Sequence, residues 1–146
     1  MFHKIITTVF GIGYIGRGGG TLAALVCSII WYLLDINGLE AIISTLAILG
    51  IGIWSAQKVE QEWGKDSSKV VIDEVAGMAI SLLFIPLVIK YTIIAFLLFR
   101  FFDIVKPLYI RKAEKLPGGW GVMMDDALAG IYSNFLLQVL LFFKLI

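Results

Sequence analysis

Five long apolar segments, each without a charged side chain, constrain the fold of this chain more than any other feature. The segments cover residues 21–34, 41–57, 75–89, 91–99 and 127–143. Hydrophobic residues make up 60% of the 146 residues, and a soluble domain of this size cannot bury that much apolar surface. A lipid bilayer is the natural solvent for such a chain. We therefore expect an all-α fold, a polytopic membrane helical bundle of about five transmembrane or re-entrant helices, in a single domain over residues 1–146.

The third and fourth segments are short, since a helix that crosses a bilayer needs about 20 residues. If they formed one continuous helix, it would measure roughly 50 Å, which is too long for a single crossing. Pro86 lacks a backbone donor and the Lys90 ammonium favours water, so we expect a hairpin bend near residues 86–91. The hairpin places Asp73 and Asp103 on the same side of the membrane, whereas one long helix would separate them.

Lysine and arginine residues are strongly biased towards one side of this five-crossing topology. Ten of the 12 lie on the side of the N-terminal segment, and only Lys90 and Lys144 lie on the other. Because cytoplasmic loops carry an excess of these residues, we predict that the first side is cytoplasmic. The net charge is only +1, so the composition does not favour a nucleic-acid partner.

Carboxylates gather at the cytoplasmic ends of the last three apolar segments. Asp73 and Glu74 precede the third segment, Asp103 follows the fourth, and Asp125 and Asp126 precede the fifth. Several carboxylates cannot share a small volume as free anions, so they must be protonated, paired with cations or bound to a metal. Oxygen ligands without histidine or thiolate suit a hard ion such as Mg²⁺.

Small residues follow both acidic pairs within four positions. They are Ala76 and Gly77 after the first pair, and Ala129 and Gly130 after the second. Small side chains let helices approach each other closely in a membrane. We therefore expect these two helices to cross closely and to bring their carboxylates together.

Two cations flank the carboxylate between these pairs. Arg100, Asp103 and Lys106 are spaced at i, i+3 and i+6 and therefore share one helical face. Such cations suit a bound phosphate, which also bridges readily to magnesium. Carboxylates, a hard metal ion and cations at a membrane surface together indicate phosphoryl chemistry on a lipid.

A glycine-rich stretch at residues 11–25 precedes the first apolar helix and contains Arg17 and Thr21. Backbone N–H groups at such a helix start can bind an anion. The stretch is not a P-loop, because no lysine follows its last glycine, and a flexible re-entrant segment fits it equally well.

Other interpretations of these residues remain open at this point. The acidic pairs could simply complement helix N-termini, and Arg100 with Asp103 could be a structural ion pair. A non-enzymatic membrane transport or scaffold protein is the main rival class. A transporter would tend to place its charged groups near the bilayer midplane, whereas here they cluster at one end.

Three blocks of this sequence resemble the signature blocks of the phosphatidylglycerophosphatase A family. The blocks are VIDEVAGM at residues 71–78, FRFFDIVKPLYI at 99–110 and GGWGVMMDDALAG at 118–130, and GGGTLAAL at 18–25 is similar to the N-terminal block of that family. The resemblance implies a magnesium-dependent enzyme of the bacterial inner membrane. It implies hydrolysis of the terminal phosphate monoester of phosphatidylglycerophosphate to phosphatidylglycerol, in phospholipid biosynthesis.

On this basis we predict a site that faces the cytoplasm in a multi-pass membrane protein. The predicted catalytic residues are Asp73, Glu74, Asp103, Asp125 and Asp126. The predicted Mg²⁺ ligands are Asp73, Glu74, Asp125 and Asp126, and the predicted substrate-binding residues are Arg17, Thr21, Arg100 and Lys106. The nucleophile is either water activated by the metal, which we favour, or an aspartate side chain. The expected partners are the phospholipid substrate and the membrane; another lipid phosphate is an alternative substrate, and the oligomeric state, a homo-oligomer included, is left open.

Overall fold

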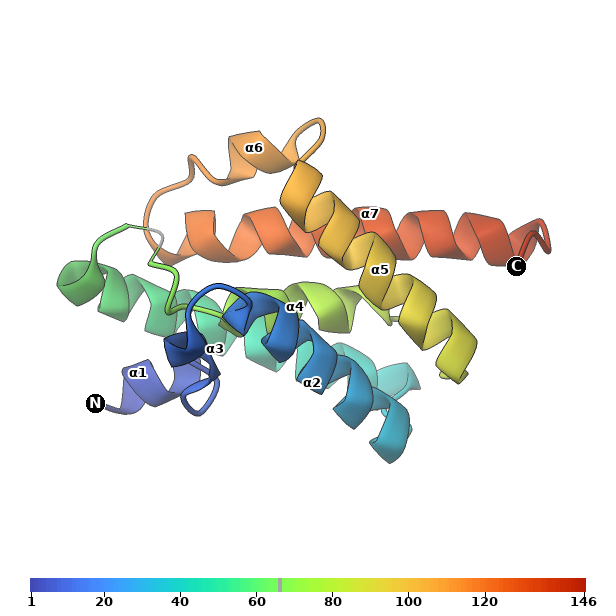
Figure 1. The fold of residues 1–146 in the computed structure, drawn as a ribbon, viewed down its shortest axis with the longest axis horizontal. Coiled ribbons are helices and arrows are strands. Elements are labelled where there is room, and N and C mark those ends of the chain that lie inside the picture. Colours follow the sequence, from blue (N-terminus) through green and yellow to red (C-terminus); the bar gives the residue numbers. More distant parts are fainter. Residues whose placement is uncertain (66) are drawn as a thin grey trace.

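A computed structural model describes residues 1–65 and 67–146, and the described residues form helices without any β-strand. The all-α prediction is therefore confirmed. Figure 1 shows the elements in chain order: α1 (Phe2–Thr7), the 3₁₀ helix η1 (Ile12–Ile15), α2 (Gly19–Leu34), α3 (Gly38–Trp63), α4 (Ile72–Ser81), α5 (Ile89–Val105), α6 (Ile110–Ala113) and α7 (Gly119–Phe142).

The short helix α4 lies at the centre of the bundle. It packs against α2, α3 and α7, and its residues Ala76, Met78 and Ala79 are completely buried. The long helices α3 and α7 run along the longest axis of the molecule, whereas α2 and α5 lie obliquely across them (Figure 1). This arrangement directs the start of α4, the start of α2 and the end of α5 towards one region.

The predicted hairpin is confirmed, although its bend comes earlier than expected. Helix α4 ends at Ser81 and α5 begins at Ile89, so the segment predicted at residues 75–89 is helical only in its first half. With ten residues, α4 measures about 15 Å, half the thickness of a hydrocarbon core. Asn134 of α7 stabilises the bend, because its side-chain amide donates hydrogen bonds to the carbonyls of Ser81 (3.1 Å) and Leu83 (2.6 Å).

Helices α4 and α7 cross very closely, as the small residues after the acidic pairs predict. A Cβ atom on Gly130 would lie 2.3 Å from the carbonyl oxygen of Gly77. A Cβ atom on Gly77 would lie 2.6 Å from the carbonyl oxygen of Asp126. Only glycine fits at this crossing, and the close approach brings the start of α4 next to the acidic pair of α7.

One described helix, α3, is long and apolar enough to cross a membrane by length and composition. Large apolar side chains are also exposed on other helices, for example Leu33 of α2 (71% exposed) and Phe135 of α7 (70%). Exposed apolar surface on this scale is typical of a surface that contacts lipid or another apolar partner.

Candidate active site

A polar cavity of about 270 Å³ lies where α2, α4, α5 and α7 meet, and all nine predicted site residues line it. The prediction that the carboxylates converge is therefore confirmed. The lining residues are Gly16, Arg17, Gly18, Gly20, Thr21, Ser67, Ser68, Val70, Asp73, Glu74, Arg100, Asp103, Lys106, Asp125 and Asp126.

Three carboxylates at the centre of this cavity have the arrangement of a metal-ligand set. Asp73 and Glu74 in the first turn of α4, and Asp126 of α7, each offer one oxygen, and these oxygens all lie within 4.8 Å of one another. Within the described part of the chain, Asp73 Oδ1 and Glu74 Oε2 are buried without any hydrogen-bond partner. Buried carboxylate oxygens are costly unless a cation or a donor satisfies them, so this group fits a hard divalent ion such as Mg²⁺.

The electrostatics of Asp73 support the same interpretation. Burial raises the pKa of its carboxyl group well above the usual value, and the neighbouring charges of Glu74 and Asp126 raise it further. Without a cation, these side chains would share protons. A divalent ion would displace those protons and stabilise the ionised carboxylates.

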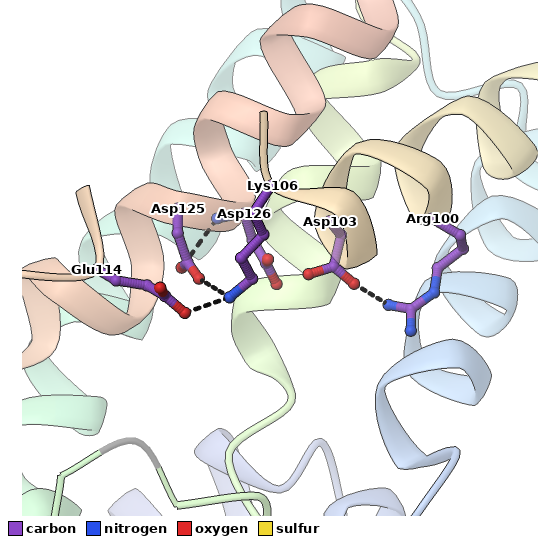
Figure 2. A network of polar contacts seen from close by, with 6 residues as sticks. All are labelled: Arg100, Asp103, Lys106, Glu114, Asp125 and Asp126. Atoms are coloured by element: carbon purple, nitrogen blue, oxygen red, sulfur yellow. Dashed lines mark hydrogen bonds and ion pairs between the residues drawn. The ribbon is translucent and has the colours of Figure 1, made fainter. Parts of the chain in front are cut away.

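The two aspartates of α7 occupy different surroundings. Asp125 Oδ2 accepts a hydrogen bond from Lys106 Nζ at 2.8 Å, and its Oδ1 accepts one from the backbone N–H of Asp126 at 2.9 Å. In Figure 2 the Asp126 carboxylate lies between those of Asp125 and Asp103. Helix α7 begins at Gly119, so both aspartates lie inside the helix, where consecutive side chains point about 100° apart. Asp126 therefore joins the three-carboxylate group, whereas Asp125, which we also predicted as a metal ligand, pairs with a lysine.

Lys106 is held between two acidic side chains. It forms ion pairs with Glu114 of the segment after α6 and with Asp125 (Figure 2). Burial alone would lower the pKa of Lys106, but the hydrogen bonds to Asp125 and Glu114 raise it, so the side chain remains an ammonium. Its backbone has a left-handed φ of +48°, which ends α5 directly before Pro107. A strained, non-glycine residue with a fixed charge is typical of a functional position.

Arg100 supplies a second cation at the cavity. Its Nη1 atom donates to Asp103 Oδ2 at 2.5 Å, and the two side chains are 18% and 13% exposed. The predicted spacing of Arg100, Asp103 and Lys106 therefore places all three at one cavity. The arrangement leaves guanidinium and ammonium donors beside the three-carboxylate group, which suits an anion bound next to a metal ion.

The glycine-rich N-terminal stretch also reaches this cavity. A Cβ atom on Gly20 would lie only 1.9 Å from Glu74 Oε1, so a glycine lets the start of α2 contact that carboxylate. Arg17 and Thr21, which we predicted as substrate-binding residues, line the same cavity. The first backbone N–H groups of a helix lack partners within the helix and attract anions.

Sequence analysis missed three polar residues of this region. Ser67 and Ser68 line the cavity from the segment between α3 and α4, and Glu114 binds Lys106. The spacing of these residues in the sequence does not indicate a role at the site, because the course of the connecting segments brings each of them there. An acidic residue within the otherwise basic segment of residues 106–115 was the single available signal for Glu114.

Comparisons with known proteins identify the family of this chain. The family model of phosphatidylglycerophosphatase A matches residues 5–141. A Bacteroides thetaiotaomicron protein that carries the provisional name phosphatidylinositol-3-phosphatase is 48% identical, over 92% of this chain and 91% of its own length. Two proteins named phosphatidylglycerophosphatase A are also similar. The one from Haemophilus influenzae is 39% identical (88% of this chain, 82% of its own), and the one from Escherichia coli is 31% identical (88% and 77%).

No solved structure matches this chain significantly. The family match nevertheless covers almost the whole sequence, including every residue of the polar cavity. The chain belongs to the phosphatidylglycerophosphatase A family and is an enzyme of the phosphatase class.

Proposed function

We propose that this enzyme hydrolyses the terminal phosphate monoester of phosphatidylglycerophosphate to give phosphatidylglycerol in phospholipid biosynthesis, and that it depends on Mg²⁺. The observation that carries the proposal is the pairing of two features in one cavity. Asp73 and Glu74 present buried carboxylate oxygens without partners, and the cations Arg100 and Lys106 stand beside them. A divalent ion and a phosphate monoester together satisfy both features.

In this proposal Asp73, Glu74 and Asp126 hold the metal ion. When bound, Mg²⁺ supplies positive charge that stabilises the charge developing on the phosphoryl oxygens. The protein contributes this ligand set in advance, because the glycine crossing of α4 and α7 fixes the distance between the carboxylates. The carboxylate side chains then need to reorganise less when the reaction occurs.

Arg100, Lys106 and the first turn of α2 bind the phosphate oxygens that do not take part in bond breaking. Asp103 orients Arg100, and Asp125 together with Glu114 orients Lys106. Long basic side chains lose much rotational freedom when they bind, so holding them in place beforehand favours the transition state. Arg17 and Thr21 lie at the same cavity and contact the phosphate or the adjacent headgroup in this proposal.

The nucleophile in this proposal is water, which attacks phosphorus opposite the leaving oxygen of the lipid. As the new P–O bond forms, the bond between phosphorus and the leaving oxygen breaks, and water loses a proton to a carboxylate. Among the residues that the structure describes, Asp103 and Asp125 are the carboxylates that line the cavity outside the three-carboxylate group, and in this proposal one of them accepts the proton. The same proton then passes to the departing alcohol, which balances the reaction.

A second substrate is favoured by a specific observation. The relative that is 48% identical is named as a phosphatidylinositol-3-phosphatase, and it covers more of this chain than the two phosphatidylglycerophosphatases described above. Both lipids carry a phosphate monoester, so the same carboxylates and cations suit either one. Arg17, Ser67 and Ser68 line the cavity, and in this proposal they would contact the glycerol or inositol headgroup.

Phosphate release from the two lipids by the purified protein tests these alternatives directly. We expect release from phosphatidylglycerophosphate in detergent with Mg²⁺, loss of release with EDTA, and loss in Asp126→Asn. Faster release from phosphatidylinositol 3-phosphate would replace the proposed substrate and leave the proposed site intact. Release that is unaffected by EDTA would contradict the metal site.

We also propose that the chain crosses the bacterial inner membrane several times, with the cavity on the cytoplasmic side. The support is the length of α3 and the sequence bias that puts ten of the 12 basic residues on one side of a five-crossing topology. A thiol-reactive probe that cannot cross membranes tests this in a Cys27→Ala background. In spheroplasts the probe should label Lys90→Cys, and it should label Lys65→Cys only after permeabilisation; the reverse pattern would contradict the orientation.

A further inference from the structure

A second cavity lies between α2 and α5, and its lining is mainly apolar, unlike that of the polar cavity. It has a volume of about 230 Å³. Its walls are mostly apolar side chains, with three hydroxyl-bearing residues, Ser28, Tyr32 and Thr92, among them. The other wall residues are Leu25, Ile29 and Leu33 of α2 and Ile89, Ile93 and Phe96 of α5. We refer to this cavity as the α2–α5 groove.

The hydroxyl groups of Ser28 and Thr92 do not make the groove polar. Ser28 Oγ donates a hydrogen bond to the carbonyl of Ala24 at 2.6 Å, and Thr92 Oγ1 donates one to the carbonyl of Val88 at 3.2 Å. The Ser28 and Thr92 hydroxyls are therefore satisfied by carbonyls one turn earlier in the chain. An apolar ligand fits such walls, whereas a polar headgroup would lose its hydrogen bonds to water there.

The groove begins one helical turn from the polar cavity on both of its walls. On α2, Thr21 lines the polar cavity and Leu25 lines the groove, one helical turn further along. On α5, Arg100 and Phe96 have the same relationship. One turn rises about 5.4 Å, so the apolar walls begin directly beside the phosphate-binding cations. Figure 1 shows α2 and α5 running obliquely in opposite directions, and the two helices are in contact.

The groove is also elongated and open along one side. Its α2 wall extends from Leu25 to Leu33, which corresponds to about 12 Å along the helix. Ile29 on this wall is 46% exposed, and Ile93 on the opposite wall is 52% exposed. An apolar groove that begins one helical turn from the polar cavity and has partly exposed walls fits a flexible hydrocarbon chain.

We propose that the α2–α5 groove binds one acyl chain of the lipid substrate while its phosphate occupies the polar cavity. This inference rests on the proposed function and adds the part of the substrate that the site chemistry leaves undefined. In the bilayer, apolar groups already surround the acyl chain of the lipid, so the groove contributes little binding free energy from the hydrophobic effect. Its contribution is orientation: an ordered chain fixes the phosphate relative to Arg100 and Lys106.

The test fills the groove with a larger side chain and varies the length of the acyl chains. Ile29→Trp fills the groove from α2, and Ile93→Trp fills it from α5. Ile30→Trp is a matched control, because Ile30 is the next residue, is 41% exposed and does not line the groove. Phosphate release is measured in detergent with Mg²⁺ from dioleoyl and dihexanoyl phosphatidylglycerophosphate.

We expect both groove variants to lose about tenfold in kcat/KM on the dioleoyl lipid and to stay within about twofold of wild type on the dihexanoyl lipid. Ile30→Trp should stay within about twofold on both lipids. If the wild type hydrolyses both lipids and the groove variants keep its chain-length preference, the groove inference is overturned while the proposed function stands. Equal losses on both lipids would overturn it as well, and a wild type inactive on both would overturn the proposed function together with it.

Discussion

The ammonium nitrogen of Lys106 lies 2.8 Å from Oδ2 of Asp125. Because of this contact, two aspartates that are neighbours in the sequence have different partners. Asp125 binds a lysine at the end of α5, whereas Asp126 joins Asp73 and Glu74 in the three-carboxylate group. The acidic pair on α7 therefore supplies one side chain to a cation and one to the proposed metal site. The different surroundings lead to different expected consequences of mutation.

Asp126→Asn should affect Mg²⁺ more strongly than Asp125→Asn does. Removing a carboxylate from the three-carboxylate group should raise the Mg²⁺ concentration for half-maximal activity and lower kcat by about a hundredfold or more. Asp125→Asn should lower kcat with little change in the Mg²⁺ requirement, because it changes the orientation of Lys106. Mg²⁺ titrations of phosphate release measure both effects. A similar rise in the Mg²⁺ concentration for half-maximal activity in both variants would mean that Asp125 is also a metal ligand.

Lys106 and Asp125 should behave as one unit in a double-mutant cycle. If Asp125 acts by orienting Lys106, then Asp125→Asn should have little further effect on kcat/KM once Lys106→Met is present. The expected coupling is about 1–3 kcal/mol, because the two residues are in direct contact. The cycle of Arg100→Met with Asp125→Asn is the matched control, since Arg100 pairs with Asp103. Additive effects of Lys106→Met and Asp125→Asn would show that Asp125 acts independently.

The sequence predicted that the charged side chains of the polar cavity converge, but it did not predict which of them form ion pairs. The apolar segments and Pro86 indicated a hairpin, and the hairpin alone brings Asp73 and Asp103 to one end. The pairing of Lys106 depends on its left-handed backbone and on the course of the chain to Glu114, which no local pattern encodes. For the same reason Ser67 and Ser68 were missed.

Helix boundaries were less predictable, because tertiary contacts as well as the local sequence decide where a helix begins and ends. Helix α7 begins at Gly119, eight residues before its apolar segment, although glycine is a poor helix former. Close packing against α3 requires glycine at this position, since a Cβ atom on Gly119 would lie 2.1 Å from the carbonyl oxygen of Ile53. Conversely, α4 stops at Ser81 within an apolar run, where Asn134 binds the carbonyls that the helix leaves free. Tertiary contacts of this kind are invisible in a hydropathy pattern.

Gly20→Ala should reduce activity without a matching loss of stability. The new methyl group would overlap Glu74 Oε1, so Glu74 or the start of α2 must move. We expect a loss of about tenfold or more in kcat/KM and a raised Mg²⁺ requirement. Gly50→Ala is the control, because its methyl group in α3 meets no atom within 4 Å and should stabilise the helix by about 0.5–1 kcal/mol. Full activity in Gly20→Ala would mean that Glu74 tolerates displacement.

Mg²⁺ affinity should increase with pH up to the raised pKa of Asp73. Burial and the charges of Glu74 and Asp126 raise the pKa of Asp73, so protons compete with the metal until the pH exceeds that raised value. Each proton released on binding gives up to about a tenfold gain in affinity per pH unit. Isothermal titration of the protein with Mg²⁺ between about pH 5.5 and about pH 7.5 measures this, with buffers of different ionisation enthalpy reporting the proton release. An affinity that does not depend on pH would mean that the carboxylates bind Mg²⁺ without losing protons.

Asn134→Leu should destabilise the bend between α4 and α5. The substitution keeps the side-chain volume similar but removes the donors to the carbonyls of Ser81 and Leu83, at 3.1 and 2.6 Å. Carbonyls left without a donor in apolar surroundings should lower the free energy of unfolding by about 1–3 kcal/mol. Gln138→Leu is the control, because exposed Gln138 only donates to Asn134 Oδ1, and it should change stability by less than about 0.5 kcal/mol. Denaturation in detergent measures both variants; equal stability of Asn134→Leu and wild type would mean that water or detergent reaches the bend and replaces the amide.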